Sequence, residues 1–295
     1  MAEAAESFSY SAPSSLADAY ALLEQHAAAG GRAQPLAGGT DMLVQLQSVD
    51  REARAIIDVK ALPETNRLEL GSDTIVIGAA IPSAVLNEHQ ELKTLYPGLL
   101  EAADLIGSTQ IQGRASVGGN LCNASPAGDS IPALIANGAV CEIGSAAGTR
   151  QLPVEDFVTG VQRNALASGE LLLALHLPRP PARSGDAYLR FTPRTEMDIA
   201  VAGCGVRITL DDQGTCTAAR VSIGAVAPTA LLVPDAAAAL VGTTLDEAAL
   251  TAAAAACSAA ANPISDKRGT VEFRRKVVGV LCRRAVTIAR NRAAG

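Results

Sequence analysis

Two glycine pairs constrain this chain more than any other feature, because each stands where an extended run must turn into a helix. The first lies in Leu36-Ala37-Gly38-Gly39-Thr40-Asp41 and the second in Ser116-Val117-Gly118-Gly119-Asn120. Glycine has no Cβ and accepts a positive φ, so each turn can present several backbone N–H groups close together. Such a row of donors binds anions. The two pairs together predict a long ligand with a phosphate bridge, such as a flavin dinucleotide, although either pair alone also fits an ordinary turn.

The composition limits the fold and the kinds of partner. With 295 residues the chain is long enough for two or three domains. Hydrophobic residues make up 48% and aromatic residues only 3%, so we expect aliphatic cores. A net charge of −6 argues against general nucleic-acid binding, which needs clustered Lys and Arg. No apolar run is long enough for a membrane span, and Met1–Ser7 lacks the basic and apolar parts of a signal peptide, so a cytoplasmic protein is predicted.

The cysteines indicate no metal centre. The six are Cys122, Cys141, Cys204, Cys216, Cys257 and Cys282. None forms a Cys-x-x-Cys motif, and none stands at ligand spacing from a histidine. Iron–sulfur clusters are held by clustered thiolates. We therefore expect free, mostly buried thiols and no iron–sulfur cluster in this chain.

The order of apolar runs and turns predicts an α+β fold in two domains. The first domain is expected over residues 1–180, with lobes at about 1–60 and 61–180. Its first lobe has the pattern β-α-β-α-β. Pro178, Pro180 and Pro181 indicate a linker. The second domain, over residues 186–292, places antiparallel strands before helices.

Individual elements carry explicit signals. Ser15 and Asp18 resemble a capping box at the start of a helix that runs to about His26. The segments Arg67–Leu70 and Thr74–Gly78 flank a three-residue turn and predict a hairpin. Thr244-Leu-Asp-Glu247 is a capping box for an alanine-rich helix that reaches Ala261.

The first glycine turn contains no Lys or Arg side chain. An FAD pyrophosphate bound there would be neutralised by amide dipoles and by the start of the following helix. Thr40 can add a hydroxyl donor, and Asp41 is expected to cap that helix. The turn lacks the G-x-G-x-x-G pattern, and no G-K-[S/T] follows it. A Rossmann or Walker site is therefore not predicted.

The second glycine turn continues into small and short polar residues. Asn120, Asn123, Ser125 and Asp129 could bind ribityl hydroxyls or the edge of a flat ring. The alternative is a structural loop closed by Asx turns. Cys122 lies in the same loop, where a small buried filler is favoured over a contact with the ring.

The residues around both turns resemble a known family. Leu36–Asp41 together with Ile106–Asp129, then Gly169–Pro178, Tyr188–Val201 and Phe273–Ala285, are similar to the FAD-binding medium subunit of the xanthine dehydrogenase and carbon monoxide dehydrogenase family of molybdenum hydroxylases. The matching segments cover nearly the whole chain in the expected order. The resemblance implies a two-lobed FAD-binding domain of the PCMH/VAO type, followed by a ferredoxin-like α/β sandwich.

The same resemblance implies the cofactor-binding residues. Leu36 to Asp41, including Ala37, Gly38, Gly39 and Thr40, would wrap the pyrophosphate, and Ser116 to Asn120, including Val117, Gly118 and Gly119, would approach the flavin and its phosphates. Asp129 would hold ribityl or ribose hydroxyls, and Leu172 would pack on the cofactor; Ser125 is a candidate from the loop pattern alone. Arg190 and Asp198 match positions beside the isoalloxazine ring, although lysine is commoner at the position of Arg190.

The implied activity is electron transfer as part of a complex. The partners would be a small subunit with two [2Fe–2S] clusters and a large molybdopterin subunit, in a dimer of heterotrimers. FAD would pass electrons to NAD or another acceptor, so this chain needs no catalytic residue for the substrate and no metal ligand. Two alternatives stay open: a self-contained flavin oxidoreductase of the same fold, and a non-redox scaffold subunit.

Overall fold

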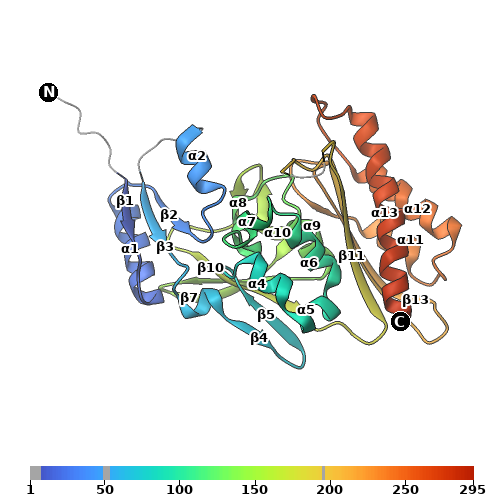
Figure 1. The fold of residues 1–295 in the computed structure, drawn as a ribbon, viewed down its shortest axis with the longest axis horizontal. Helices are drawn as coiled ribbons and strands as arrows, with labels where there is room; N and C mark the ends of the chain where they lie inside the picture. The colour runs from blue at the N-terminus through green and yellow to red at the C-terminus, as the bar shows by residue number, and fades with distance from the viewer. Residues whose placement is uncertain (1–7, 49–53, 195–196) are drawn as a thin grey trace.

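The computed structural model describes residues 8–48, 54–194 and 197–295. Met1–Ser7, on which the expectation about a signal peptide rests, lie outside these ranges, as do Thr195 and Glu196 of the family-like segment. Three main sheets follow one another along the longest axis (Figure 1). We name the parts around them the N-terminal lobe (8–48 and 54–60), the middle lobe (61–180) and the C-terminal unit (184–194 and 197–295).

The N-terminal lobe is a small parallel sheet with a helix packed on it. Its elements are β1 (Ser9–Ser11), α1 (Leu16–Ala28), β2 (Ala33–Leu36), α2 (Met42–Ser48) and β3 (Ala55–Asp58). Strand β3 lies between β1 and β2 and runs parallel to both. Helix α1 begins as predicted, because the Oγ of Ser15 accepts the N–H of Asp18 at 3.1 Å. The predicted β-α-β-α-β order is confirmed.

The middle lobe is built on a five-stranded antiparallel sheet in the order β4-β5-β10-β6-β7. Its strands are β4 (Leu68–Leu70), β5 (Thr74–Gly78), β6 (Val140–Ser145), β7 (Gly148–Pro153) and β10 (Leu171–Pro178), and a separate pair joins β8 (Val158–Gly160) to β9 (Arg163–Asn164). Strands β4 and β5 form the predicted hairpin. Strand β10 is central, and its continuous apolar run is buried on both faces.

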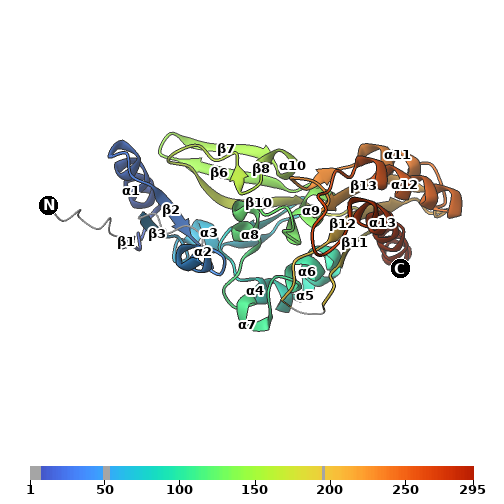
Figure 2. The ribbon, with the colours of Figure 1, turned by 90° about the horizontal axis from the view of Figure 1, so that it is seen from above.

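Short helices cover this sheet. They are α3 (Pro63–Asn66), α4 (Ser83–Glu88), α5 (Gln90–Leu95), α6 (Pro97–Asp104), α7 (Thr109–Gln112), α8 (Val117–Asn123), α9 (Ser130–Ala136) and α10 (Val154–Phe157). Seen from above, helices α4 to α7 lie together at the bottom of the view, and strands β6 and β7 of the sheet lie at the top (Figure 2). The resulting core is aliphatic, as the composition predicts, with Tyr96 and Phe157 among its few aromatic side chains.

The C-terminal unit is a four-stranded antiparallel sheet with helices on one face. Its elements are β11 (Ser184–Phe191), β12 (Ala202–Leu210), β13 (Cys216–Gly224), β14 (Leu231–Leu232), α11 (Pro234–Leu240), α12 (Glu247–Ala260) and α13 (Val271–Ala294). Helices α12 and α13 lie together on the outer side (Figure 1). Strands followed by helices make the chain an α+β protein, as predicted.

The other face of the C-terminal sheet packs on the middle lobe through α9. A Cβ added to Gly205 would lie 2.6 Å from the carbonyl oxygen of Pro132, and one added to Gly224 would lie 2.5 Å from the Cγ of Pro132. The absence of these Cβ atoms lets the sheet approach the helix backbone. Tyr188 of β11 reaches further and belongs to the hydrophobic core of the middle lobe. The two parts therefore share a close-packed interface.

One predicted helix cap is wrong. The capping residue of α12 is Asp246, whose Oδ1 accepts the N–H of Ala249 at 2.9 Å, and not Thr244. The reason lies at Leu245, which is fully buried and has a φ of +57°. This left-handed residue turns the chain after Thr244, so Asp246 is the residue that faces the first helical N–H groups.

Candidate functional site

A pocket opens between the N-terminal lobe and the middle lobe, and both glycine pairs line it. The cavity has a volume of about 220 Å³. The predicted site residues on its wall are Ala37, Gly38, Gly39, Thr40, Asp41, Ser116, Gly118, Gly119, Asn120 and Leu172. Segments far apart in sequence thus meet at one site, as the paired-turn hypothesis requires.

The first glycine turn needs glycine at both positions. A Cβ on Gly38 would lie 2.9 Å from the Cα of Ala115 and would also collide with the carbonyl group of Arg114. Gly39 has a φ of +76°, a conformation that side chains rarely adopt. Within the described residues, the N–H groups of Gly38, Gly39 and Thr40 donate to no other protein group. The turn therefore offers three adjacent donors to a ligand.

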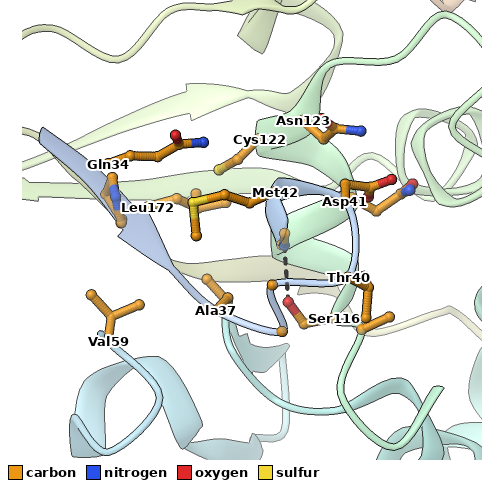
Figure 3. A pocket seen from close by; sticks show the side chains of 18 of the residues that line it. Gln34, Ala37, Thr40, Asp41, Met42, Val59, Ser116, Cys122, Asn123 and Leu172 are labelled. Atoms are coloured by element: carbon orange, nitrogen blue, oxygen red, sulfur yellow. Dashed lines mark hydrogen bonds between the residues drawn. The ribbon is translucent and has the colours of Figure 1, made fainter. Parts of the chain in front are cut away.

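The second glycine pair differs from the prediction. Gly118 and Gly119 lie in the first turn of α8, and neither has a positive φ. Ser116 caps this helix, because its Oγ accepts the N–H of Gly119 at 3.0 Å (Figure 3). The glycines serve close packing instead: a Cβ on Gly118 would lie 2.5 Å from the oxygen of Ala79, and one on Gly119 would lie 2.9 Å from the Oγ of Ser116.

Further side chains complete the pocket wall. Gln34, Met42, Cys122 and Leu172 surround the same space (Figure 3). The Oε1 of Gln34 accepts from the Nη1 of Arg54 at 2.7 Å, so the side-chain amide is held in place. Sequence reasoning missed Gln34 and Met42. The only signal was their position directly before and after the glycine turn.

Gln45 and Asn123 join the two lobes across the pocket by a side-chain hydrogen bond, and Cys122 adds a thiol to its wall. The Nε2 of Gln45 on α2 donates to the Oδ1 of Asn123 on α8 at 3.0 Å. Burial raises the pKa of the Cys122 thiol to about 12, so it stays neutral at physiological pH. Cys122 lines the pocket, yet a neutral thiol is no nucleophile, and we assign it a packing role.

Among the residues that the structure describes, no basic side chain lines the pocket. Asp41 is the one charged residue on its wall among the described residues. Although Asp41 as a whole is exposed, loss of water around its carboxyl raises the pKa of that group. A bound diphosphate would have its charge balanced by backbone N–H groups rather than by Lys or Arg. The glycine cradle and the three N–H donors that stay unpaired within the described residues fit the diphosphate of FAD.

Two other predicted residues lie next to the pocket without lining it. Leu36 and Val117 are buried beneath the two glycine segments, with exposed fractions of 9% and 1%. Ser125 closes a local turn, since its Oγ accepts the N–H of Ala127 at 3.3 Å. For these three residues, direct contact with a cofactor stays a prediction.

Asp129 and Arg190 meet each other at the junction of the middle lobe and the C-terminal unit. The Nη1 of Arg190 donates to the Oδ2 of Asp129 at 2.6 Å, and both side chains are less than one-tenth exposed. Asp198 lies elsewhere, beside Arg194 and Arg268 at 3.5 and 3.7 Å. These three residues do not line the pocket. The binding of cofactor hydroxyls by Asp129 and the position of Arg190 and Asp198 beside the flavin ring stay predictions.

The cysteines are free, as predicted, and five of the six are buried. Over the described ranges, no group of three or more His, Cys, Asp or Glu has an arrangement that could hold a metal ion. In that same part of the chain, no helix is both long enough and apolar enough to cross a bilayer.

Two family models together match most of the chain. The family described as FAD binding domain in molybdopterin dehydrogenase matches residues 6–180. The family described as CO dehydrogenase flavoprotein C-terminal domain matches residues 187–289. The first match alone covers more than half of the chain and contains the whole pocket wall.

Individual relatives agree with the family models. The chain is 35% identical to the carbon monoxide dehydrogenase medium chain of Afipia carboxidovorans, over 97% of this chain and 98% of the relative. It is 32% identical to the xanthine dehydrogenase FAD-binding subunit of Escherichia coli O157:H7, over 97% of each.

Solved structures give the same result. A chain of carbon monoxide dehydrogenase from Hydrogenophaga pseudoflava superimposes with a TM-score of 0.92 at 32% identity, covering 97% of this chain and 98% of the other. A chain of reconstituted CO dehydrogenase from Oligotropha carboxidovorans gives 0.91 at 35% identity, with the same two coverages. This chain therefore belongs to the family of FAD-binding subunits of the molybdenum hydroxylases, the oxidoreductases that include carbon monoxide dehydrogenase and xanthine dehydrogenase.

Proposed function

We propose that this chain is the electron-transfer subunit of a molybdenum hydroxylase complex. It receives electrons from [2Fe–2S] clusters of a small partner subunit and delivers them to an external acceptor such as NAD, while the substrate is oxidised at a large molybdopterin subunit. The observation that carries the proposal is the pocket between the two lobes, where a glycine turn holds three unpaired N–H groups. FAD bound there supplies the redox chemistry, and the protein supplies position and electrostatics.

The chain's own residues would hold the two ends of FAD differently. Ala37 to Asp41 wrap the pyrophosphate with backbone donors, and Ser116 to Asn120 bring α8 against the cofactor. Leu172 packs on it. Asp129 and Ser125 hold hydroxyls of the ribityl chain or ribose, and Arg190 and Asp198 stand beside the flavin ring. A cation near that ring favours the anionic reduced form, which gives Arg190 a role.

The proposed organisation follows from the same family. Residues 1–180 form the FAD-binding domain and residues 186–292 form the C-terminal domain. The thiols of this chain are dispersed or buried, so iron–sulfur ligands would come from the small partner subunit. We propose a cytoplasmic heterotrimer with the small and large subunits, paired as a dimer of heterotrimers.

The test is the flavin content and redox behaviour of the purified full chain. We expect the isolated chain to bind FAD, to show the visible bands of a flavoprotein, and to be reduced by dithionite and reoxidised by an acceptor. Gly38→Ala should lose FAD, because the added Cβ meets the backbone at Arg114 and Ala115. Gly113→Ala is the matched control, since its Cβ meets only the oxygen of Gln110 at 3.7 Å.

Each other outcome points to a different function. No flavin band in the wild-type chain, before or after addition of FAD, would contradict the proposal and favour a scaffold subunit. Turnover of a small substrate by the lone chain would favour a self-contained flavin oxidoreductase. Co-purification of the native complex would identify the partner subunits directly.

A further inference from the structure

Tyr188 of β11 makes an unusual contact for a residue of the C-terminal sheet. Its side chain is 3% exposed and lies in the hydrophobic core of the middle lobe. The neighbouring strand makes room for its hydroxyl at Gly203, where a Cβ would lie 2.5 Å from the Tyr188 Oη. That hydroxyl donates to the Oδ1 of Asp129 at 2.8 Å. The C-terminal unit thus places one buried hydroxyl on one carboxylate of the middle lobe.

The second oxygen of the same carboxylate forms an ion pair with a cationic side chain of the same strand. The Nη1 of Arg190 donates to the Oδ2 of Asp129 at 2.6 Å. Tyr188 and Arg190 are two residues apart, so they point to the same face of β11. Asp129 is therefore held by a neutral donor and a cation on adjacent positions of one strand. We name Tyr188, Asp129 and Arg190 the junction triad.

The junction triad lies directly behind the pocket wall on two sides. Arg190 also donates to the carbonyl oxygen of Leu105 at 3.2 Å, and the next residue, Ile106, lines the pocket. Ser130, which follows Asp129, donates through its hydroxyl to the Oδ1 of Asn120 at 2.8 Å, and Asn120 lines the pocket as well. A change in the charge of the triad would therefore act on a cofactor across one layer of residues.

The charge state of Asp129 depends on its donors. The pKa of this carboxyl lies above its usual value, because burial raises it more than Arg190 and the Tyr188 hydroxyl lower it. Burial also raises the pKa of Tyr188 well above its usual value, so the hydroxyl keeps its proton and stays a donor. Beyond Arg190, the thiol of Cys204 on β12 is the other titratable group that faces Tyr188. Loss of the Tyr188 hydroxyl removes a contact that favours the carboxylate.

We propose that Tyr188 is a positioning residue of the flavin site: by donating to the Oδ1 of Asp129 it holds that carboxylate against Arg190, and so sets how much of the Arg190 charge reaches the cofactor. This inference rests on the proposed function, since it requires FAD in the pocket. A carboxylate that turns away from Arg190 leaves the guanidinium less compensated. A less compensated cation stabilises the reduced, anionic flavin and raises its midpoint potential.

The test compares Tyr188→Phe with Tyr96→Phe in the FAD-loaded full chain. Tyr96 is the matched control, because it is a buried tyrosine of the same core whose hydroxyl donates to the carbonyl of Pro178 at 2.8 Å. We expect a more positive flavin midpoint potential in Tyr188→Phe, and the wild-type potential in Tyr96→Phe. Thermal unfolding of both variants separates a loss of packing from a change in potential.

A double-variant cycle checks that Tyr188 acts through Asp129. Asp129→Asn should also raise the potential, and adding Tyr188→Phe to it should give no further shift. An unchanged or more negative potential in Tyr188→Phe, or full additivity with Asp129→Asn, would overturn the inference. The proposed function would fail separately, by absence of FAD from the wild-type chain. If the double variant does not fold, the comparison of the two tyrosine variants still decides.

Discussion

The glycines of the pocket differ in what a side chain would meet there. Gly118 faces the backbone at Ala79, whereas Gly119 faces the capping hydroxyl of Ser116 and, at 3.8 Å, the Cβ of Ala37 across the pocket wall. The two neighbours therefore respond to substitution for different reasons. A side chain at Gly118 would collide with the backbone and hinder folding. A side chain at Gly119 would collide with Ser116 and occupy space in the pocket.

This difference leads to a prediction for Gly119→Ala. The backbone at Gly119 is helical, where alanine is favoured over glycine by roughly 0.5–1 kcal/mol, so the variant should fold. Its Cβ must displace the Ser116 Oγ and narrows the pocket, so we expect FAD affinity to fall at least about tenfold, a loss of about 1.4 kcal/mol. Fluorescence titration with FAD measures the affinity. The prediction is wrong if affinity stays within twofold of the Gly113→Ala control.

The ion pair of Arg150 with Glu170 predicts that the stability of the protein depends on pH. Arg150 donates to both carboxylate oxygens of Glu170 at 2.7 Å, and this contact lowers the pKa of Glu170. Because the folded state holds Glu170 ionised, the pair stabilises the protein above the usual pKa of glutamate. That contribution disappears as the pH falls through the lowered value.

We therefore expect Glu170→Gln to lower the free energy of unfolding at pH 7 by at most about 1 kcal/mol, as is usual for partly exposed pairs. The difference from wild type should shrink towards zero as the pH falls below about 4. Urea unfolding at several pH values measures it. Glu69→Gln is the control, since its contact with Arg67 is 3.9 Å long and Glu69 is exposed. A difference that grows at low pH would contradict this account.

At the scale of elements, local signals predicted what local contacts decide. The Ser15 cap and the hairpin of β4 and β5 were predictable, because capping and turn formation involve residues only a few positions apart. The cap of α12 was not, because the buried, left-handed Leu245 moves the cap to Asp246. The prediction of a turn at the second glycine pair was wrong for a similar reason, because a contact distant in sequence decides it. Its glycines are required by the approach of Ala79, which is distant in sequence.

The site was predictable only in part, for the same physical reason. The two glycine segments and Leu172 line one pocket, as the sequence and the family resemblance imply. The pairing of Asp129 with Arg190, 61 positions away, depends on how the C-terminal sheet docks on the middle lobe. No local pattern reports such a contact. The same holds for Tyr188, whose insertion into the core of the middle lobe gives no signal in the sequence.

At the scale of the whole molecule, Asp186 links the C-terminal unit to the middle lobe. Its carboxylate accepts the N–H groups of Gly98 and Leu99 at 2.9 and 3.0 Å and the Nδ2 of Asn137 at 2.9 Å. The residue is 3% exposed. One side chain of β11 thus accepts hydrogen bonds from two N–H groups in the first turn of α6 and from the side chain at the end of α9. Burial of the two N–H groups makes the link necessary, because neither has water as an alternative partner, whereas the Nδ2 of Asn137 also donates to the oxygen of Ala133 at 2.9 Å.

We predict that Asp186→Ala uncouples the two parts. The buried N–H groups of Gly98 and Leu99 lose their acceptor and Asn137 loses one of two, at a cost of about 3 kcal/mol in the free energy of unfolding. The loss is confined to the interface, so calorimetry should resolve two transitions where the wild type has one. Asp246→Ala is the control, because it removes a helix cap inside the C-terminal unit and should cost about 1 kcal/mol without splitting the transition. A single transition in Asp186→Ala would disprove this role.

The position of the pocket between two lobes has a consequence for the lifetime of the protein in a cell. One wall comes from the small N-terminal lobe and the other from the middle lobe, so a ligand that fills the gap binds only while both are folded and in place. Binding of that kind adds about 2.7 kcal/mol of stability at a ligand concentration one hundred times the dissociation constant. A newly made chain without flavin lacks this support, so we expect faster proteolysis of its N-terminal lobe. The supply of cofactor would thus decide how many chains survive long enough to meet their partners.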